Sequence, residues 1–515
     1  MILGDDCRLF KGGINMSKYI IGIDAGTTGI RAIAFDHDSN ILSNAYSEFT
    51  QYFPEPGWVE HDADEIFDVT MAMIKQCVEE GNLSFDDLVA IGITNQRETT
   101  VLWDKNTGKS VCRSIVWQDM RTADRVSAYN KKYGDSYYGK TGSSGLTNST
   151  GPKVEWIMAN NPEVKAGIEA GNILYGWIDT WLIWKLSGGK AHVTDFTNLA
   201  GTLLGDITIL DYCDDMLKEF GIPREILPTP HVTGKFSVDT DPEGFFGYAV
   251  PIAASAGDQT SSAIGQACIK PGMVKNTYGT GSFMVLNVGT ELKKDIPIES
   301  GLFLETANDI VGEQHYALEG FANVSGSAIQ WLRDGAGVCT NAKEAEELAN
   351  SVEDNGGVYF VPAFAGLPNG SDPYARGTII GITRGTTKAH LCRAAIEAMA
   401  YQVAESFEAM AAYGGVELTA VRADGGGAKN DFLCQFQADI LGVPVERPVI
   451  TETTCLGVAY LAGVNVGFWK DMDEVAEKWQ CEKRFEPRLS EDERKKLMAG
   501  WKNAVKHASG WLKGF

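Results

Sequence analysis

The stretch KYIIGIDAGTTGIRAIAFD, residues 18–36, decides the fold. It contains two runs rich in β-branched and apolar residues, at 19–24 and 30–35, with a short Gly/Thr segment between them. Two such runs around a glycine-containing turn predict a β-hairpin. The first run ends on a carboxylate, Asp24, so the hairpin places an acidic side chain beside its turn.

A second hairpin of the same kind is expected about 250 residues further on. The stretch MVKNTYGTGSFMVLNV, residues 273–288, again has two strand-like runs, and YGTG at 278–281 forms the turn. Two halves of similar size that each carry such a hairpin predict duplicated α/β domains facing one another. We expect the boundary between them near residues 258–272.

The remaining chain supports an α/β alternation. In residues 390–412, apolar side chains recur at spacings of three and four, which is typical of one buried helix face. Further strand-like runs lie at 88–94, 99–103 and 357–362. At 515 residues the chain is long enough for two to four domains.

The overall charge restricts the partners. There are 45 basic and 68 acidic residues, so the formal net charge is −23. Long-range attraction to nucleic acid or to an anionic membrane is disfavoured by such a charge. No run of 18 or more apolar residues occurs, so we expect no membrane insertion.

The cysteines and the N-terminus indicate a location in the cytoplasm. The ten cysteines are dispersed without a C-x-x-C pair, which favours free thiols in a reducing compartment. Residues 1–17 lack the basic start and apolar core of a secretory signal, and we interpret them as an extension or a misassigned start. No H-E-x-x-H motif is present, so a catalytic zinc is not expected.

Three short segments could carry chemistry. DAGTT at 24–28 places a carboxylate before small residues whose backbone N–H groups can approach a phosphate, although a plain hairpin turn would read the same. AGDQT at 256–260 places Asp258 after an apolar run, as a general base or as an N-cap for a helix beginning near Ser261. DGGGAKN at 424–430 leaves room for a flat ligand, or is a simple turn.

In order, D-x-G-T-T, N-Q-R-E-T, G-D-Q, Y-G-T-G-S and D-G-G-G-A resemble the motifs of the FGGY carbohydrate kinases. That family belongs to the actin, hexokinase and Hsp70 superfamily of ATP-binding folds. The resemblance runs from about residue 19 to 511 and is strongest to the glycerol kinases of the family. It implies two duplicated actin-like (ribonuclease H-like) domains, 18–265 and 266–515, with a cleft between them.

The resemblance implies transfer of the γ-phosphoryl group of ATP to a terminal hydroxyl of glycerol, giving sn-glycerol 3-phosphate and ADP. Asp258 matches the general base, and Asp24 with Asp258 would hold Mg²⁺. The positions that match nucleotide-binding residues are Thr27, Thr28, Arg31, Thr280, Gly326, Gln330, Gly426 and Asn430. The positions that match acceptor-binding residues are Arg97, Glu98, Trp117, Asn148, Asp258, Gln259 and Phe283.

These acceptor positions suit a polyol. A charged donor beside a charged acceptor, Arg97 and Glu98, can satisfy a vicinal diol, although an empty pair would form a salt bridge. Trp117 and Phe283 would form apolar walls that exclude water, or would belong to the core. The segment 149–156 retains the lysine and tryptophan of a family signature, at Lys153 and Trp156.

The likeness has two gaps. Asn148 stands where glycerol kinases have a tyrosine that contacts glycerol, and the loop at 366–372 departs from the family. A kinase for another short polyol or ketose, such as erythritol, threitol or xylulose, is therefore the alternative. A non-catalytic actin- or Hsp70-like nucleotide-binding protein is a more remote one. The family also implies a homodimer or a homotetramer.

Overall fold

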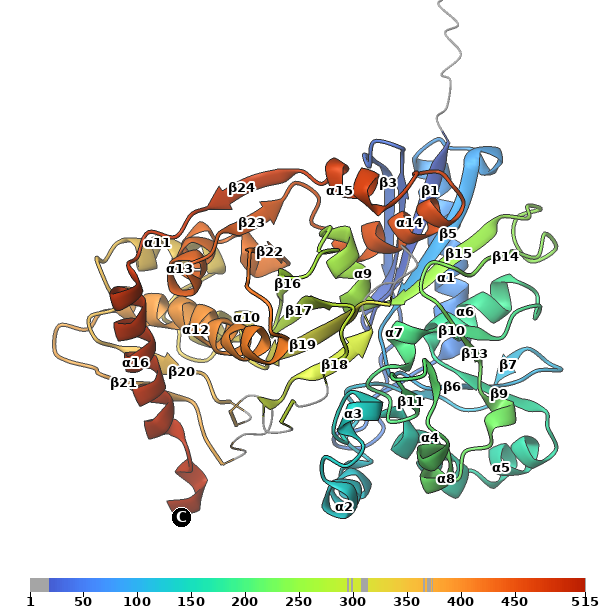
Figure 1. Cartoon of the computed structure of the whole chain (residues 1–515), viewed down its shortest axis with the longest axis horizontal. Coiled ribbons are helices and arrows are strands. Elements are labelled where there is room, and N and C mark those ends of the chain that lie inside the picture. The colour runs from blue at the N-terminus through green and yellow to red at the C-terminus, as the bar shows by residue number, and fades with distance from the viewer. Residues whose placement is uncertain are drawn as a thin grey trace, which may run out of the picture.

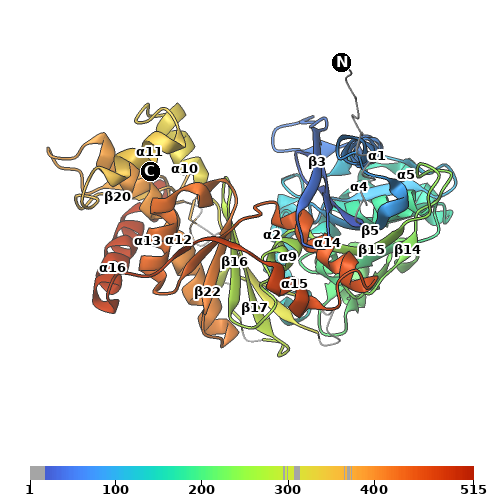
Figure 2. The same cartoon turned by 90° about the horizontal axis from the view of Figure 1, so that it is seen from above.

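The computed structural model describes residues 18–293, 296–297, 300–306, 314–364, 366–367, 372 and 374–514. The predicted extension at 1–17, and most of the unusual loop at 366–372, lie outside these residues. The chain forms two lobes, with the blue-to-green first half on one side and most of the yellow-to-red second half on the other (Figures 1 and 2).

A six-stranded sheet organises the first half, in the order β14-β15-β5-β1-β2-β3. Its strands are β1 (Tyr19–Ala25), β2 (Gly29–Phe35), β3 (Ile41–Glu48), β5 (Leu88–Asn95), β14 (Val238–Asp239) and β15 (Pro251–Gly257). β1 and β2 pair antiparallel, so the first predicted hairpin is confirmed. β5 runs parallel to both β1 and β15, and the ends of these three strands share one edge.

The second half repeats this plan in a seven-stranded sheet, in the order β18-β19-β17-β16-β22-β23-β24. Its strands are β16 (Met273–Tyr278), β17 (Ser282–Gly289), β18 (Phe303–Thr306), β19 (Tyr316–Ala322), β22 (Ala420–Asp424), β23 (Val445–Pro448) and β24 (Cys481–Phe485). Leaving β18 aside, each neighbouring pair has the same direction as its counterpart in the first sheet. The predicted duplication is therefore confirmed.

Helices cover one face of each sheet. α1 (Ala63–Glu80) and α6 (Ile178–Leu186) bury the side chains of β1 that alternate toward them. The predicted helix at 390–412 is α12 (Lys388–Gly414), which packs with α13 (Asp431–Leu441) and α16 (Glu491–Ala508) on the second sheet. All five residues of its expected face are buried, namely Ile396, Met399, Val403, Phe407 and Met410.

The other face of the first sheet is covered by a helix from the second half, α14 (Thr453–Asn465), which lies beside the blue strands in Figure 1. α14 can approach because Gly22 and Gly92 are paired in register on β1 and β5. A Cβ on either glycine would lie 2.2 Å from a backbone oxygen of α14. α14 also packs on α9 (Asp258–Gly265), so packing crosses the predicted boundary between the halves.

A further layer is inserted between β5 and β15. It holds small sheets of β6 (Val101–Asp104), β7 (Lys109–Ser110) and β9 (Ile173–Gly176), and of β10 (Val193–Asp195) and β13 (Thr229–His231). The helices of this layer are α2 (Ala123–Tyr133), α3 (Tyr138–Thr141), α4 (Thr150–Asn160), α5 (Pro162–Glu169), α7 (Phe196–Leu199) and α8 (Asp214–Phe220). A separate hydrophobic core around Tyr175 and Trp177 holds much of it together.

Among the described residues, no helix is both long and apolar enough to cross a membrane. The nine cysteines in the described part of the chain are all free thiols, and eight of them are at least half-buried.

Candidate active site

Asp24 and Asp258 lie at the same edge of the first sheet. Asp24 is the second-last residue of β1 and lies opposite Thr94 of β5. Ala256 of β15 pairs with the same Thr94 from the other side, two residues before Asp258. Burial and the neighbouring charge of Asp258 raise the pKa of Asp24 to about 7. The two carboxylates lie on either side of β5 and repel one another, and a cation between them would relieve this repulsion.

Asp258 is the first residue of α9, and Gly257 occupies the N-cap position. The alternative that Asp258 caps a helix beginning near Ser261 is therefore wrong. Its Oδ1 accepts a hydrogen bond from its neighbour's backbone N–H at 2.9 Å, and its Oδ2 accepts from Gln259 Nε2 at 3.1 Å. The Asp258 side chain retains 33% of its accessible surface, so a ligand can still reach the carboxylate.

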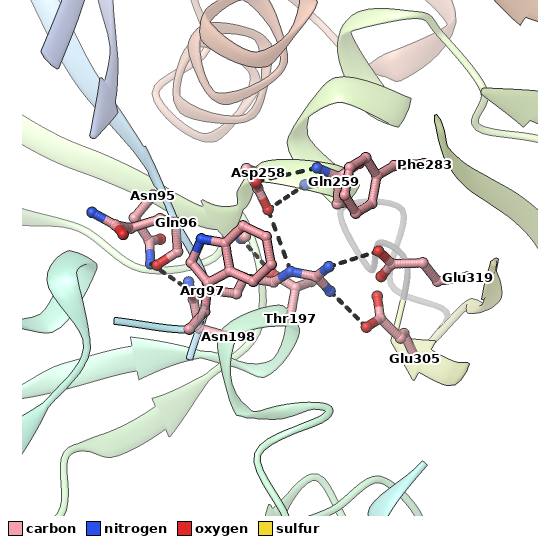
Figure 3. A network of polar contacts seen from close by, with 12 residues as sticks. Asn95, Gln96, Arg97, Thr197, Asn198, Asp258, Gln259, Phe283, Glu305 and Glu319 are labelled. Carbon is pink, nitrogen blue, oxygen red and sulfur yellow. Dashed lines mark hydrogen bonds and ion pairs between the residues drawn. The ribbon is translucent and has the colours of Figure 1, made fainter. Parts of the chain in front are cut away.

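Arg97 follows β5 and lies at the centre of the acidic network in Figure 3. Its Nε is 3.3 Å from Asp258 Oδ1. Its Nη1 donates to Glu305 at 2.6 Å and its Nη2 to Glu319 at 2.8 Å. Since β18 and β19 carry these glutamates, Arg97 of the first half is held by the second half.

Glu98 is buried and has an unusual backbone, with φ at 54°. A non-glycine residue in this left-handed region is strained. Lys153 of α4 is fully buried and donates to the backbone oxygens of Glu98 at 3.2 Å and Asn148 at 2.8 Å. Burial raises the pKa of Glu98 to about 7, although Arg97 and Lys153 oppose the shift.

The aromatic positions connect the acceptor residues to other parts of the site. Trp117 is half-buried, and its Nε1 donates to Thr27 Oγ1 at 2.9 Å, which joins a predicted acceptor wall to the turn of the opening hairpin. Phe283 is half-buried on β17, beside Gln259 (Figure 3). Gln259 Oε1 accepts from the buried Lys275 Nζ at 2.6 Å.

The remaining first-half nucleotide positions lie around the opening hairpin. Thr28 is exposed in the turn. Arg31 pairs with Asp24 across the hairpin register, and its Nε is 3.3 Å from Glu452 of the second half. Arg31 therefore lies across the hairpin from Asp24, and the nucleotide-binding role of these positions stays a prediction.

The second-half positions group around its own hairpin turn. The backbone oxygen of Thr280 accepts from the N–H groups of Ser325 and Ser327, at 2.8 and 3.2 Å. Gly326 begins α10 (Gly326–Asp334), and a Cβ there would lie 2.7 Å from a turn oxygen. Gln330 is exposed on the same helix.

The glycines after β22 do different things. A Cβ on Gly425 would lie 2.6 Å from the backbone oxygen of Tyr278, and one on Gly427 would lie 2.7 Å from the Tyr278 side chain. Gly426 instead faces open space, with no atom within 4 Å of its added Cβ. Asn430 caps α13 through its Oδ1, which accepts from the N–H of Leu433 at 2.8 Å.

Sequence reasoning missed several of the charged residues in these networks. It assigned no role to Glu305, Glu319, Lys275 or Lys153. Each lysine had one signal in the sequence. Lys275 is a cation in a run that is otherwise typical of a buried strand, and Lys153 belongs to the retained family signature at 149–156. Asp424 is likewise buried, and it accepts hydrogen bonds from Gln266, Ser262, Thr453 and Thr277, which ties α9, α14 and β16 together.

The carboxylates of Asp24 and Asp258 fit a magnesium ion that is shared with phosphates. Among the described residues, no group of three or more His, Cys, Asp or Glu side chains could enclose a metal ion. Mg²⁺ typically takes only one or two carboxylates, with phosphate oxygens and water completing its octahedron. A cavity of about 260 Å³ lies elsewhere, beside Trp501 and Gln402, and the described residues that line it include none of the predicted site.

Comparison with known proteins places most of the chain in one family. The N-terminal domain model of the FGGY family of carbohydrate kinases matches residues 19–265, and the C-terminal domain model matches residues 274–466. The "Glycerol kinase" of Nitratidesulfovibrio vulgaris (strain DP4) is 50% identical over 504 residues, covering 96% of this chain and 100% of that protein. "Glycerol kinase 2" of Thermotoga maritima is 48% identical, with the same coverage.

Solved structures agree. The glycerol kinase of Plasmodium falciparum, crystallised with ADP, has a TM-score of 0.90 and 33% identity, covering 96% of this chain and 98% of that chain. A xylulose kinase from Rhodospirillum rubrum has a TM-score of 0.84 at 23% identity, covering 95% and 99%, and so shares the fold. The chain belongs to the FGGY family of carbohydrate kinases.

Proposed function

We propose that this protein is an ATP-dependent kinase that phosphorylates a terminal hydroxyl of glycerol, giving sn-glycerol 3-phosphate and ADP. The observation that carries the proposal is the meeting of Asp258, Arg97 and Asp24 at one edge of the first sheet. In this set Asp258 can act as a base, Arg97 can donate hydrogen bonds to hydroxyl groups, and Asp24 can bind a cation. The kinship with glycerol kinases over 96% of the chain supports glycerol as the acceptor.

In this proposal Asp258 is the general base. The acceptor hydroxyl oxygen forms a bond to the γ-phosphorus, the bond from that phosphorus to the β-phosphate oxygen breaks, and the hydroxyl proton moves to Asp258. Hydrogen bonds from Gln259 fix the base at both of its oxygens. Such positioning matters because phosphoryl transfer is catalysed mainly by alignment and by electrostatic stabilisation.

Arg97 and Glu98 would bind two neighbouring hydroxyls of the acceptor, with Trp117, Gln259 and Phe283 around its carbon chain. Asn148 belongs to the same pocket in this proposal, because Lys153 ties its backbone to that of Glu98.

The nucleotide would lie between the two hairpin turns. Thr27, Thr28 and Arg31 would face its phosphates from the first half, and Thr280 from the second. The adenosine would lie over Gly426, where the backbone is open, near Gly326, Gln330 and Asn430. Asp24 and Asp258 would hold Mg²⁺, which neutralises phosphoryl charge when bound.

The test is ATP consumption with glycerol by the wild type and by Asp258→Asn. We expect kcat to fall about 10²- to 10⁴-fold in the variant, since its amide cannot accept the hydroxyl proton. Turnover close to that of the wild type would remove Asp258 as the base.

Asn148 supports a second candidate, a kinase for another short polyol or ketose such as erythritol, threitol or xylulose. Its side chain is shorter than the tyrosine of glycerol kinases and offers both a donor and an acceptor. A panel of C3 to C5 polyols and ketoses decides between the two, because glycerol should give the highest kcat/KM in the first case only.

We also propose the division into domains at 18–265 and 266–515, a homodimer or homotetramer, and a location in the cytoplasm. The free thiols of the described residues are consistent with a reducing compartment. Gel filtration with light scattering measures the oligomeric state.

A further inference from the structure

A cluster of charges joins the two halves at the acceptor site. Arg97 comes from the edge of the first sheet, whereas Glu305 and Glu319 come from β18 and β19 of the second (Figure 3). Glu319 pairs with Phe303 in the antiparallel register, and Glu305 lies two residues further along β18. The two glutamates therefore project from the same face of the second sheet toward one guanidinium.

The three side chains are buried together. The side chains of Arg97, Glu305 and Glu319 keep only 10%, 3% and 6% of their accessible surface. One oxygen of each glutamate, Oε2, is buried without a hydrogen bond. Two neighbouring carboxylates in such surroundings are costly unless a cation compensates them, and Arg97 supplies that cation.

Burial raises the pKa of Glu305, and the positive charge of Arg97 opposes that shift. The two glutamates therefore need the positive charge of Arg97, and Arg97 needs their negative charge. Breaking one side of a buried ion pair leaves the other uncompensated.

The cluster borders the proposed acceptor pocket. A Cβ added to Gly201 would lie 3.3 Å from Glu98 Oε1 and 4.0 Å from Glu305 Oε1, so these two glutamates approach the same point. Arg97 Nε is also 3.3 Å from the proposed base Asp258. Glu305 therefore lies next to the acceptor residues, although it belongs to the other half.

The donors of Arg97 divide between two tasks. A guanidinium has five N–H groups in a fixed planar fork. Glu305 takes one from Nη1 and Glu319 takes one from Nη2. Nε lies 3.3 Å from Asp258 Oδ1, and each terminal nitrogen has a second N–H that these glutamates do not take. The glutamates can therefore fix the plane of the fork and still leave donors for hydroxyls.

We propose that Glu305 and Glu319 are positioning residues of the acceptor site, which hold the Arg97 guanidinium in its hydroxyl-binding orientation only when the second half is closed against the first. This inference rests on the proposed function. It assigns the two glutamates no contact with the acceptor, and it makes binding of the polyol depend on the approach of the two halves.

The test compares steady-state kinetics of Glu305→Ala, Glu305→Gln and Glu319→Gln with the wild type. We expect Glu305→Ala to raise the acceptor KM about 10- to 100-fold, the usual cost of a lost hydrogen bond to a charged group. The KM for ATP should stay within about twofold, because the nucleotide does not contact Arg97 in this proposal. Glu305→Gln should be milder, since its amide oxygen still accepts from Nη1.

Glu397→Gln is the matched control. Glu397 is also a buried glutamate of the second half, and it pairs with Arg393 at 2.9 Å on α12, away from Arg97. Its kinetics should equal those of the wild type.

If circular dichroism shows that Glu305→Ala does not fold, the test uses Glu305→Gln and Glu319→Gln instead. Acceptor KM values within twofold of the wild type in the folded variants overturn the proposal.

A second measurement separates this proposal from the proposed function. If the wild type phosphorylates no polyol or ketose of the panel, the proposed function fails, and small-angle X-ray scattering then decides. A larger radius of gyration for Glu305→Ala or Glu305→Gln than for the wild type and Glu397→Gln supports a contact of Glu305 with Arg97 that holds the two halves together. An unchanged radius of gyration overturns it.

Discussion

Glu98 is the residue at which backbone strain and proposed chemistry coincide. Its positive φ of 54° costs free energy that the surroundings must offset. The Lys153 ammonium does so by donating to its backbone oxygen, and the same ammonium also holds the backbone of Asn148. Lys153 thus supports two proposed acceptor positions through their backbone oxygens.

Replacing Lys153 by methionine tests this support. We expect the acceptor KM to rise about 10-fold or more, because Glu98 loses the contact that holds its conformation, while the KM for ATP changes little. Lys185→Met is the control, because Lys185 also donates to a backbone oxygen, that of Gly108 at 3.0 Å, outside the site. Equal acceptor KM values in the two variants would contradict the role of Lys153.

Asp179 predicts a pH dependence of stability. It is fully buried, and burial together with the charge of Asp195 raises its pKa to about 7. Between its ordinary pKa near 4 and about 7, the folded chain retains a proton that the unfolded chain has lost, so this contribution to stability falls as pH rises through that window.

Asp179→Asn should remove this loss, because an amide stays neutral. We expect the variant to be more stable than the wild type at pH 8, by about 1–2 kcal/mol, and to gain little or nothing at pH 4.5. Urea unfolding at both pH values measures the difference. A gain of the same size at both would show that charge is not the cause.

At the scale of elements, two neighbouring glycines in the turn after β22 have different surroundings. Gly425 has φ at 80°, and a Cβ there would collide with the Tyr278 backbone, whereas Gly426 faces open space. Gly425→Ala should therefore lower the free energy of unfolding by about 1–3 kcal/mol.

Gly426→Ala is the matched variant in the same turn. It should unfold at nearly the temperature of the wild type but raise the KM for ATP several-fold, because the added methyl group would occupy the place proposed for adenosine. A normal KM for ATP in Gly426→Ala would argue against that placement.

The hairpins could be predicted because their signal is local. Strand, turn and strand follow one another within 20 residues, and Asp24 lies near the end of β1 while Asp258 directly follows β15. Glu305 and Glu319 could not be found in this way, because 208 and 222 residues separate them from Arg97. Their role depends on how the second sheet is placed against the first, and periodicity within a strand says nothing about that placement.

At the scale of the whole molecule, the two halves are not independent. α14 comes from the second half but buries Ile20, Ile33 and Phe35 of the first sheet. Polar contacts add to this packing, since Tyr460 OH is 3.0 Å from Ser39 Oγ and Asn465 donates to Ala253 at 2.9 Å. One face of the first sheet therefore gains its cover only when the chain is nearly complete.

This arrangement predicts that residues 18–265 do not fold alone. Without α14, the paired glycines Gly22 and Gly92 would form an open apolar groove between exposed isoleucines, and exposed apolar surface of this kind promotes aggregation. We expect the fragment to show no cooperative unfolding transition by circular dichroism and to aggregate at micromolar concentration.

Two further fragments show whether α14 is the missing part. Co-expression of residues 266–515 should keep residues 18–265 soluble and give a complex that unfolds cooperatively, because α14 can then bind the open face of the sheet. The same co-expression with Gly457→Ala should recover less complex, since the added Cβ would lie 1.8 Å from the Ser261 backbone oxygen, where α14 meets α9. Cooperative unfolding of 18–265 alone would show instead that the first half is a self-sufficient domain that does not need α14 to fold.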